Sequence, residues 1–192
     1  MAVFTYAHNS FLTERSIQKG LRQLGVDYFD VLLLGWFPNP PRKGILEGAR
    51  RLKEKGLVHH LGISSHNRKV FPELLKEPDY DLFHLRYNAG HTGAETDIFP
   101  FLPEKNKPGI VSFTATSWGK LLNAKKIQEK ETTPTAQDCY RFVLSNPNVD
   151  ICMMGAKNLQ QMRENLDVLD KGPLSSEEMD RMIRIGDFIY RR

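Results

Sequence analysis

The chain has 192 residues, of which 40% are hydrophobic and 26% charged, and its formal net charge is +4 at pH 7. This length and composition are typical of a globular protein with one sizeable core. The basic and acidic residues are interspersed and no basic run alternates with aromatic residues, which argues against nucleic-acid binding. The sequence shows no secretory signal, no stretch of membrane-spanning length, no CxxC pair and no metal-ligand spacing. The two cysteines read as core residues of a reducing compartment, so we expect a cytoplasmic protein without a bound metal.

The first half of the chain alternates short apolar runs with amphipathic stretches. Continuous apolar runs of strand length indicate strands buried on both faces, and apolar residues at three- and four-residue steps indicate helices. The expected elements are, in order, a strand tail at 1–6, a helix at 14–24 capped by Thr13, a strand at 29–34, a helix at 45–55, a strand at 58–63, a short helix around 70–75 and a strand at 82–87.

The second half continues the same alternation. Helix starts are marked by Thr133 with Pro134, by Asn158 and by the capping box from Ser175 to Glu178. The expected elements are a helical turn at 98–102, a strand at 109–114, a helix from 133 to 143, a strand at 149–154, a helix from 159 whose apolar face is Leu159, Met162, Leu166 and Leu169, and a last helix presenting Met179, Met182, Ile183 and Ile189 inward.

The turn between the last strand and the helix that follows it is suited to an anion. Gly155 lets a ligand approach the backbone, and Asn158 begins a helix whose free amide groups carry partial positive charge. Lys157 adds a full charge beside them. An ordinary strand-to-helix connection would look the same, so the phosphate interpretation depends on the rest of the chain.

Alternating strands and helices predict an α/β fold with parallel strands. The first strand is not followed by GxGxxG, which disfavours a dinucleotide-binding doubly wound sheet. The remaining common solution is a (β/α)8 TIM barrel, in which phosphate sites follow the last two strands. The turns at 115–120 and 155–158 follow the last two strands here, which favours a phosphate site.

Several segments together resemble the aldo/keto reductase family. The segment 16–30 is similar to the family's SLxxLGxDYxD motif, 61–65 to its GxSN turn, and Tyr87 with Asn88 to its YN pair. The most specific likeness is the family's GAxxxxQxxEN signature, represented by Gly155, Ala156, Gln161, Glu164 and Asn165. The resemblance runs from about residue 3 to the end. It implies a single partial domain over 1–192, an incomplete barrel that covers about strands 4 to 8 with a stub of strand 3 and a C-terminal helix.

The resemblance also implies an oxidoreductase that binds NADP(H) and transfers hydride to or from a small carbonyl or alcohol substrate. In the family's arrangement Ser64, Ser65 and His84 would lie near the nicotinamide amide, and Trp36 with Phe37 would line the substrate pocket. The positive charge of Lys157 would favour NADP over NAD. The cofactor-binding residues implied for the last two turns are Thr116, Ser117, Trp118, Gly119, Lys120, Leu121, Gly155, Lys157, Gln161, Glu164 and Asn165.

The sequence departs from the family at the catalytic tetrad. Strands 1 and 2, which carry the family's Asp and Tyr, have no counterpart, and Gly35 occupies the place of its His. The catalytic residues are therefore not assigned, and loss of a general acid would cost about 10²–10⁴-fold in rate. Two unpaired sheet edges would favour a homo-oligomer or a strand-completing partner. A non-catalytic nucleotide-binding or interaction protein on the same truncated barrel is the alternative function.

Overall fold

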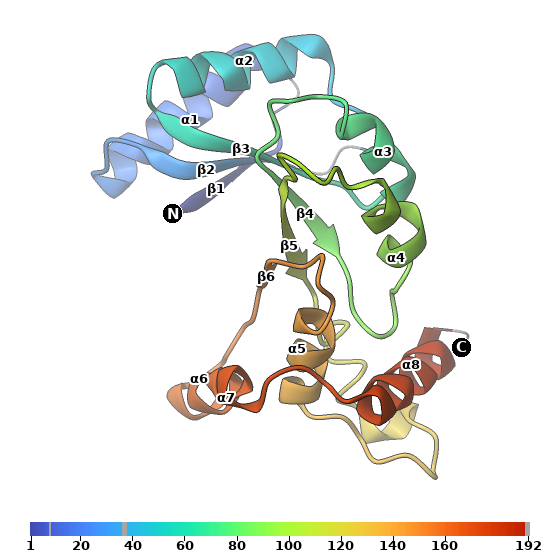
Figure 1. The fold of residues 1–192 in the computed structure, drawn as a ribbon. Helices are drawn as coiled ribbons and strands as arrows, with labels where there is room; N and C mark the ends of the chain where they lie inside the picture. The colour runs from blue at the N-terminus through green and yellow to red at the C-terminus, as the bar shows by residue number, and fades with distance from the viewer. Residues whose placement is uncertain (8, 36–37, 191–192) are drawn as a thin grey trace. The chain divides into compact units, whose positions relative to one another are not determined.

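A computed structural model describes residues 1–7, 9–35 and 38–190, which divide into two compact units. The first unit contains residues 1–85 and 100–109, and the second contains residues 86–99 and 110–192. In both units parallel strands alternate with helices along the chain (Figure 1). No described helix has both the length and the apolar character needed to cross a membrane.

The first unit is built on four parallel strands that pair in sequence order. They are β1 (Ala2–Thr5), β2 (Phe29–Leu34), β3 (Val58–Ser64) and β4 (Leu82–Arg86). The strand tail expected at 1–6 is confirmed, and the other three strands lie within one residue of their expected bounds. Leu32, Leu34, Leu61 and Ile63 have no exposed side-chain surface, because helices cover one face of these strands and side chains fill the other.

The four-stranded sheet is strongly curled. Strands three places apart in a flat sheet are separated by about 14 Å. The rings of Phe4 on β1 and His84 on β4 are nevertheless only 5.5 Å apart, centroid to centroid. Their side chains therefore meet across a concave face, as expected if the unit is part of a barrel wall.

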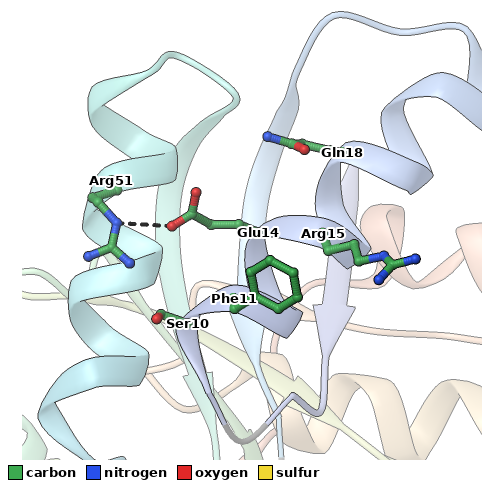
Figure 2. Close-up of a pocket in the computed structure, with 6 residues that line it drawn as sticks. All are labelled: Ser10, Phe11, Glu14, Arg15, Gln18 and Arg51. Atoms are coloured by element: carbon green, nitrogen blue, oxygen red, sulfur yellow. Dashed lines mark hydrogen bonds and ion pairs between the residues drawn. The ribbon is translucent and has the colours of Figure 1, made fainter.

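Two long helices connect the first strands. They are α1 (Ser10–Leu24) and α2 (Lys43–Glu54), followed by the short η1 (Arg68–Val70) and α3 (Phe71–Leu74). Glu14 of α1 accepts a hydrogen bond from Arg51 of α2 at 2.9 Å (Figure 2). It accepts a second one from Lys55 at 3.0 Å. The hydrogen bond from Lys55, followed by that from Arg51, lowers the pKa of Glu14. These ion pairs join the two helices on their outer side.

The N-cap expected at Thr13 is wrong, because α1 begins four residues earlier. Asn9 is the N-cap and its side chain accepts from the amide of Leu12 at 2.8 Å. The Thr13 hydroxyl instead donates to the Asn9 carbonyl, inside the first turn. Gly25 ends the helix with a φ of 65°, as the sequence indicates.

The second unit has two parallel strands and a group of helices. Its elements are α4 (Ala94–Asp97), β5 (Gly109–Phe113, from Ile110 on), η3 (Ala124–Lys126), α5 (Ala136–Leu144), β6 (Ile151–Cys152), α6 (Leu159–Leu166), α7 (Val168–Lys171) and α8 (Ser176–Tyr190). The short η2 (Phe99–Phe101) lies at the boundary between the two units in the sequence. Tyr87 is central to its core, with its ring 5.4 Å from that of Phe99 and 5.7 Å from that of Phe142. The Tyr87 hydroxyl donates to Glu95 at 2.5 Å and accepts from Asn146 at 3.1 Å, so burial leaves its polar atom satisfied.

Three expectations for this unit need correction. The strand expected at 149–154 has ladder pairing only at Ile151 and Cys152. The helix expected from Thr133 begins at Ala136, because Thr135 and Asp138 form the capping box. The apolar face expected to be buried is exposed: Leu159, Met162, Leu166 and Leu169 are 66%, 41%, 44% and 75% exposed. Asn165 and Val168 take the inner positions instead, because the helix ends at Leu166 and a separate turn follows.

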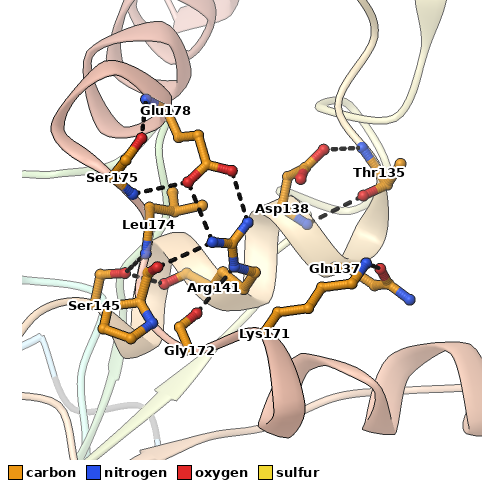
Figure 3. Close-up of polar contacts among 11 residues, drawn as sticks. Thr135, Gln137, Asp138, Arg141, Ser145, Lys171, Gly172, Leu174, Ser175 and Glu178 are labelled. Carbon is orange, nitrogen blue, oxygen red and sulfur yellow. Dashed lines mark hydrogen bonds and ion pairs between the residues drawn. The ribbon is translucent and has the colours of Figure 1, made fainter.

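Helix α8 is fixed to α5 by one arginine (Figure 3). Arg141 donates to both carboxylate oxygens of Glu178, at 2.8 and 3.1 Å, and to the carbonyl oxygens of Gly172 and Pro173. Ser175 and Glu178 also form the capping box predicted at the start of α8, with their reciprocal bonds at 2.7 and 3.2 Å. The guanidinium therefore ties the start of the 172–175 connection to the first turn of α8.

Candidate functional site

The most informative pocket lies within the second unit and has a volume of about 630 Å³. Its wall comes from the turn after β5, the inner face of α5, the turn after β6 and the first two turns of α6. Residues implicated by the sequence that line it are Thr116, Trp118, Gly119, Gly155, Lys157, Gln161, Glu164 and Asn165. Two turns separated by about 35 residues thus contribute to one cavity. Ser117, Lys120 and Leu121 belong to the first turn but do not line the pocket.

The turn after β5 has an unusual backbone. Ser117, Trp118 and Gly119 are consecutive residues in the left-handed region, with φ of 50°, 54° and 78°. Non-glycine residues in this region are uncommon and cost about 1–3 kcal/mol each when the backbone is strained. Hydrogen bonds within the turn maintain it: the amide of Gly119 donates to the Thr116 carbonyl, and that of Lys120 to the Ser117 carbonyl, both at 3.0 Å. Such turns concentrate at ligand-binding sites.

The conformation of the turn after β6 is stabilised by hydrogen bonds between the turn and the start of α6. Asn158 is the N-cap of α6, as predicted, and its side chain accepts from the amide of Gln161 at 2.9 Å. The Gln161 side chain in turn accepts from the amide of Lys157 at 2.9 Å. A side chain on Gly155 would meet no other atom within 4 Å, so the backbone is open to an approaching group.

The electrostatics of this turn suit an anion. Lys157 makes no ion pair with any residue that the structure describes, and its ammonium group is exposed. It stands directly before a helix N-terminus, where the partial charge is positive. Glu164 is the acidic residue of the pocket wall, and its carboxylate accepts from Gln160 at 2.9 Å. The positive charge of Lys157 and the dipole of α6 therefore both favour an anion at this end of the pocket.

Sequence reasoning missed other parts of the wall. Ala136 and Tyr140 lie one helical turn apart on α5, and Met153 with Met154 precede Gly155. The four-residue spacing was the signal available for the first pair. Tyr140 is only 6% exposed, and burial raises its pKa while the backbone of Gly155 acts in the opposite direction. The rest of the wall is Thr114, Ala115 and Leu122.

The first unit brings together Ser64 and His84. They are paired in the register of β3 and β4 at the last residue of β3, and both side chains are buried. Burial lowers the pKa of His84 to about 4, so its imidazole is neutral at pH 7. Ser65 is also buried, and its hydroxyl accepts from the amide of Asn67 at 3.0 Å, which stabilises the turn after β3.

Gly35 is sterically restricted by a neighbouring aromatic ring. It ends β2, and its amide donates to the Thr5 carbonyl at 2.9 Å. A Cβ atom at this position would lie 2.7 Å from a ring carbon of Tyr6. Any residue other than glycine would require that ring to move. The predicted substrate residues Trp36 and Phe37 lie outside the described residues.

A second cleft, of about 600 Å³, lies between α1 and α2 of the first unit (Figure 2). Its walls carry both charges of the Glu14–Arg51 ion pair together with the exposed ring of Phe11. None of the residues implicated by the sequence lies there. Within the described part of the chain, no group of three histidine, cysteine or acidic residues is placed to hold a metal ion.

The comparisons with known proteins agree with this arrangement. The family model described as "Aldo/keto reductase family" matches residues 7–131 and 119–187. The chain belongs to the aldo/keto reductase family.

The individual relatives have low sequence identity to this chain. The oxidoreductase YqkF of Bacillus subtilis is 23% identical over 194 residues, covering 86% of this chain and 63% of that protein. The methylglyoxal reductase YeaE of Escherichia coli is 23% identical over 172 residues, covering 84% of this chain and 60% of that protein. An aldo-keto reductase from Klebsiella pneumoniae, solved in complex with NADPH, has 20% identity and a TM-score of 0.79, covering 97% of this chain and 68% of that one. The chain therefore spans about 60% of the length of these curated relatives.

Proposed function

We propose that this chain binds NADP(H) in the pocket of the second unit and takes part in hydride transfer between the cofactor and a small carbonyl or alcohol substrate. The observation that carries the proposal is that both turns implicated by the sequence line one cavity. Further support comes from family membership and from the Klebsiella pneumoniae relative, whose structure holds NADPH. The relative named methylglyoxal reductase supports an aldehyde as the substrate class.

Each group of residues has a proposed task. Lys157 would compensate the charge of the 2′-phosphate of the cofactor, which favours NADP over NAD. Gly155, Gln161, Glu164 and Asn165 would hold the adenosine end. The turn of residues 117–121, of which Trp118 and Gly119 line the pocket, would border the pyrophosphate. Ser64, Ser65 and the neutral imidazole of His84 would hydrogen-bond the nicotinamide amide, and Trp36 with Phe37 would contact the substrate. When bound, the cofactor supplies or accepts the hydride, and no proton donor is assigned among the residues of this chain.

Turnover would separate the proposed enzyme from a non-catalytic nucleotide-binding protein. The purified chain would be mixed with NADPH and a panel of aldehydes that includes methylglyoxal, and loss of NADPH absorbance would be followed. We expect oxidation of NADPH that depends on the aldehyde and is slower with NADH. NADPH binding without turnover would favour the non-catalytic alternative.

We also propose that the chain corresponds to the later strands of a family barrel, acts in the cytoplasm and associates with a second copy or another chain. Within the described residues β1 pairs only with β2, and β6 only with β5. The free thiols of Cys139 and Cys152, whose pKa values burial raises to about 12, support a reducing compartment. Sedimentation velocity over a range of concentrations would detect a self-associating chain.

A further inference from the structure

Trp118 is an exposed aromatic side chain at the wall of the nucleotide pocket. Its side chain is 58% exposed although large aromatic rings usually bury most of their surface. It lines the same cavity as Lys157, Gln161 and Asn165. The other aromatic residue of that wall, Tyr140, is 6% exposed, so Trp118 offers most of the aromatic surface that a ligand could contact.

The indole is supported by its neighbours within the second unit. The guanidinium carbon of Arg86 lies 5.5 Å from the ring centroid, in a cation–π contact. The His91 ring meets the indole edge to face at 6.1 Å and 83°. His91 is itself held by the Tyr190 ring, at 5.0 Å, and by the side-chain oxygen of Asn88, at 3.2 Å. The ring is thus oriented before any ligand binds.

The backbone of the turn also constrains the position of Trp118. Trp118 has a φ of 54° and stands between Ser117 and Gly119, which are also left-handed. Most of the hydrogen bonds that close this turn run between backbone groups, so the direction of the Trp118 Cα–Cβ bond follows from the turn. A rigid and exposed aromatic ring loses little conformational freedom when a flat ligand stacks on it.

We propose that Trp118 stacks on the adenine ring of the nucleotide bound in this pocket, and this proposal rests on the proposed function. A purine offers a π-face to an indole whatever its hydrogen-bonding pattern, and such stacking on an aromatic side chain is energetically substantial. Lys157 carries the positive charge of the same pocket, and the 2′-phosphate of an NADP adenosine lies on the ribose next to the base. One cavity therefore offers an aromatic partner for the adenine base and a cationic partner for the 2′-phosphate.

The test uses 2′-AMP, which has the base and the phosphate but no nicotinamide. Trp36→Phe leaves Trp118 as the single tryptophan, so its fluorescence reports on this site. We expect a saturable fluorescence change with 2′-AMP and none with inorganic phosphate or nicotinamide mononucleotide. By calorimetry, Trp118→Ala should weaken 2′-AMP binding by about 5- to 100-fold, and Trp118→Phe should retain most of the affinity. Circular dichroism would check that both variants are folded.

Each contrary result of this test would overturn a different claim. Equal affinity of the wild type and Trp118→Ala for 2′-AMP would overturn the stacking proposal and leave the proposed function intact. A fluorescence change with nicotinamide mononucleotide but not with 2′-AMP would overturn the assignment to adenine. Failure of the folded wild type to bind either NADPH or 2′-AMP would overturn the proposed function itself.

Discussion

At the scale of single residues, two glycines have opposite surroundings. Gly186 of α8 lies against the backbone of the 88–91 loop, where an added Cβ atom would be 1.8 Å from the carbonyl oxygen of Ala89. Gly155 has no atom within 4 Å of that position. The first glycine therefore permits close packing, whereas the second keeps a backbone open at the pocket.

We predict that Gly186→Ala destabilises the protein by at least about 3 kcal/mol, because α8 must move away from a backbone that cannot yield. Chemical denaturation would measure the loss. Gly44→Ala in α2 is the matched control, since its added Cβ meets nothing within 4 Å and alanine favours a helix. A loss of less than about 1 kcal/mol for Gly186→Ala would contradict the close contact.

Local sequence predicted some capping residues and not others, for a physical reason. The caps at Asn158 and at Ser175 with Glu178 are both confirmed. At α1 and α5 several polar residues spread over four or five positions compete for each start. Asn9 and Thr135 are used instead of the expected Thr13 and Thr133. Helix packing decides between such candidates, and the local sequence does not contain that information.

The cap of α1 provides a test of this choice. We predict that Asn9→Ala lowers the free energy of unfolding by about 1 kcal/mol, because the amide of Leu12 loses its acceptor. Lys19→Ala on the exposed side of the same helix is the control and should change stability by less than about 0.5 kcal/mol. Equal effects of the two substitutions would show that Asn9 is not the cap.

At the scale of elements, the stability that the Arg141–Glu178 ion pair between α5 and α8 contributes depends on pH. The hydrogen bonds from Arg141 and from the Ser175 amide lower the pKa of Glu178 to about 2, from an ordinary value of 4.5. A carboxyl group whose pKa is lowered by folding stabilises the folded state fully above its unfolded pKa. That contribution declines as the pH falls from about 4.5 toward 2.

We therefore predict that Glu178→Gln is less stable than the wild type at pH 7 and that the difference shrinks on acidification, vanishing near pH 2. Urea denaturation at several pH values would follow it. Glu177→Gln is the neighbouring control, since Glu177 is exposed and makes no ion pair among the residues described here. A difference that stays constant between pH 7 and pH 2 would contradict the lowered pKa.

The helix after β6 shows where a periodic pattern misleads. Leu159, Met162 and Leu166 repeat at helical spacing, yet all are exposed and Asn165 is buried. The side chain of Gln137 on α5 donates to the carbonyl oxygen of Glu164. This polar contact and the N-cap, rather than an apolar face, position α6 at the pocket. The periodicity predicted the helix correctly but not the face that it buries.

At the scale of the whole molecule, the alternation of strands and helices predicted the fold class. Parallel strands buried on both faces have a sequence pattern that can be recognised locally, so β2, β3, β4 and β5 were all found close to their bounds. The pocket was predictable only in part. Its two turns carry glycine and helix-start signals. The four-residue spacing of Ala136 and Tyr140 shows that they share a face of α5, but that this face lines the pocket depends on tertiary packing.

The measurement that tests the account most directly is the titration of the purified chain with NADPH, followed by cofactor fluorescence. We predict saturable binding that Lys157→Ala weakens by about 10-fold or more, because one charge interaction with the 2′-phosphate is lost. Lys130→Ala, which removes an equal charge outside the pocket, should bind like the wild type. The absence of binding by a folded wild-type sample, or equal binding by Lys157→Ala, would contradict a phosphate site in the turn after β6.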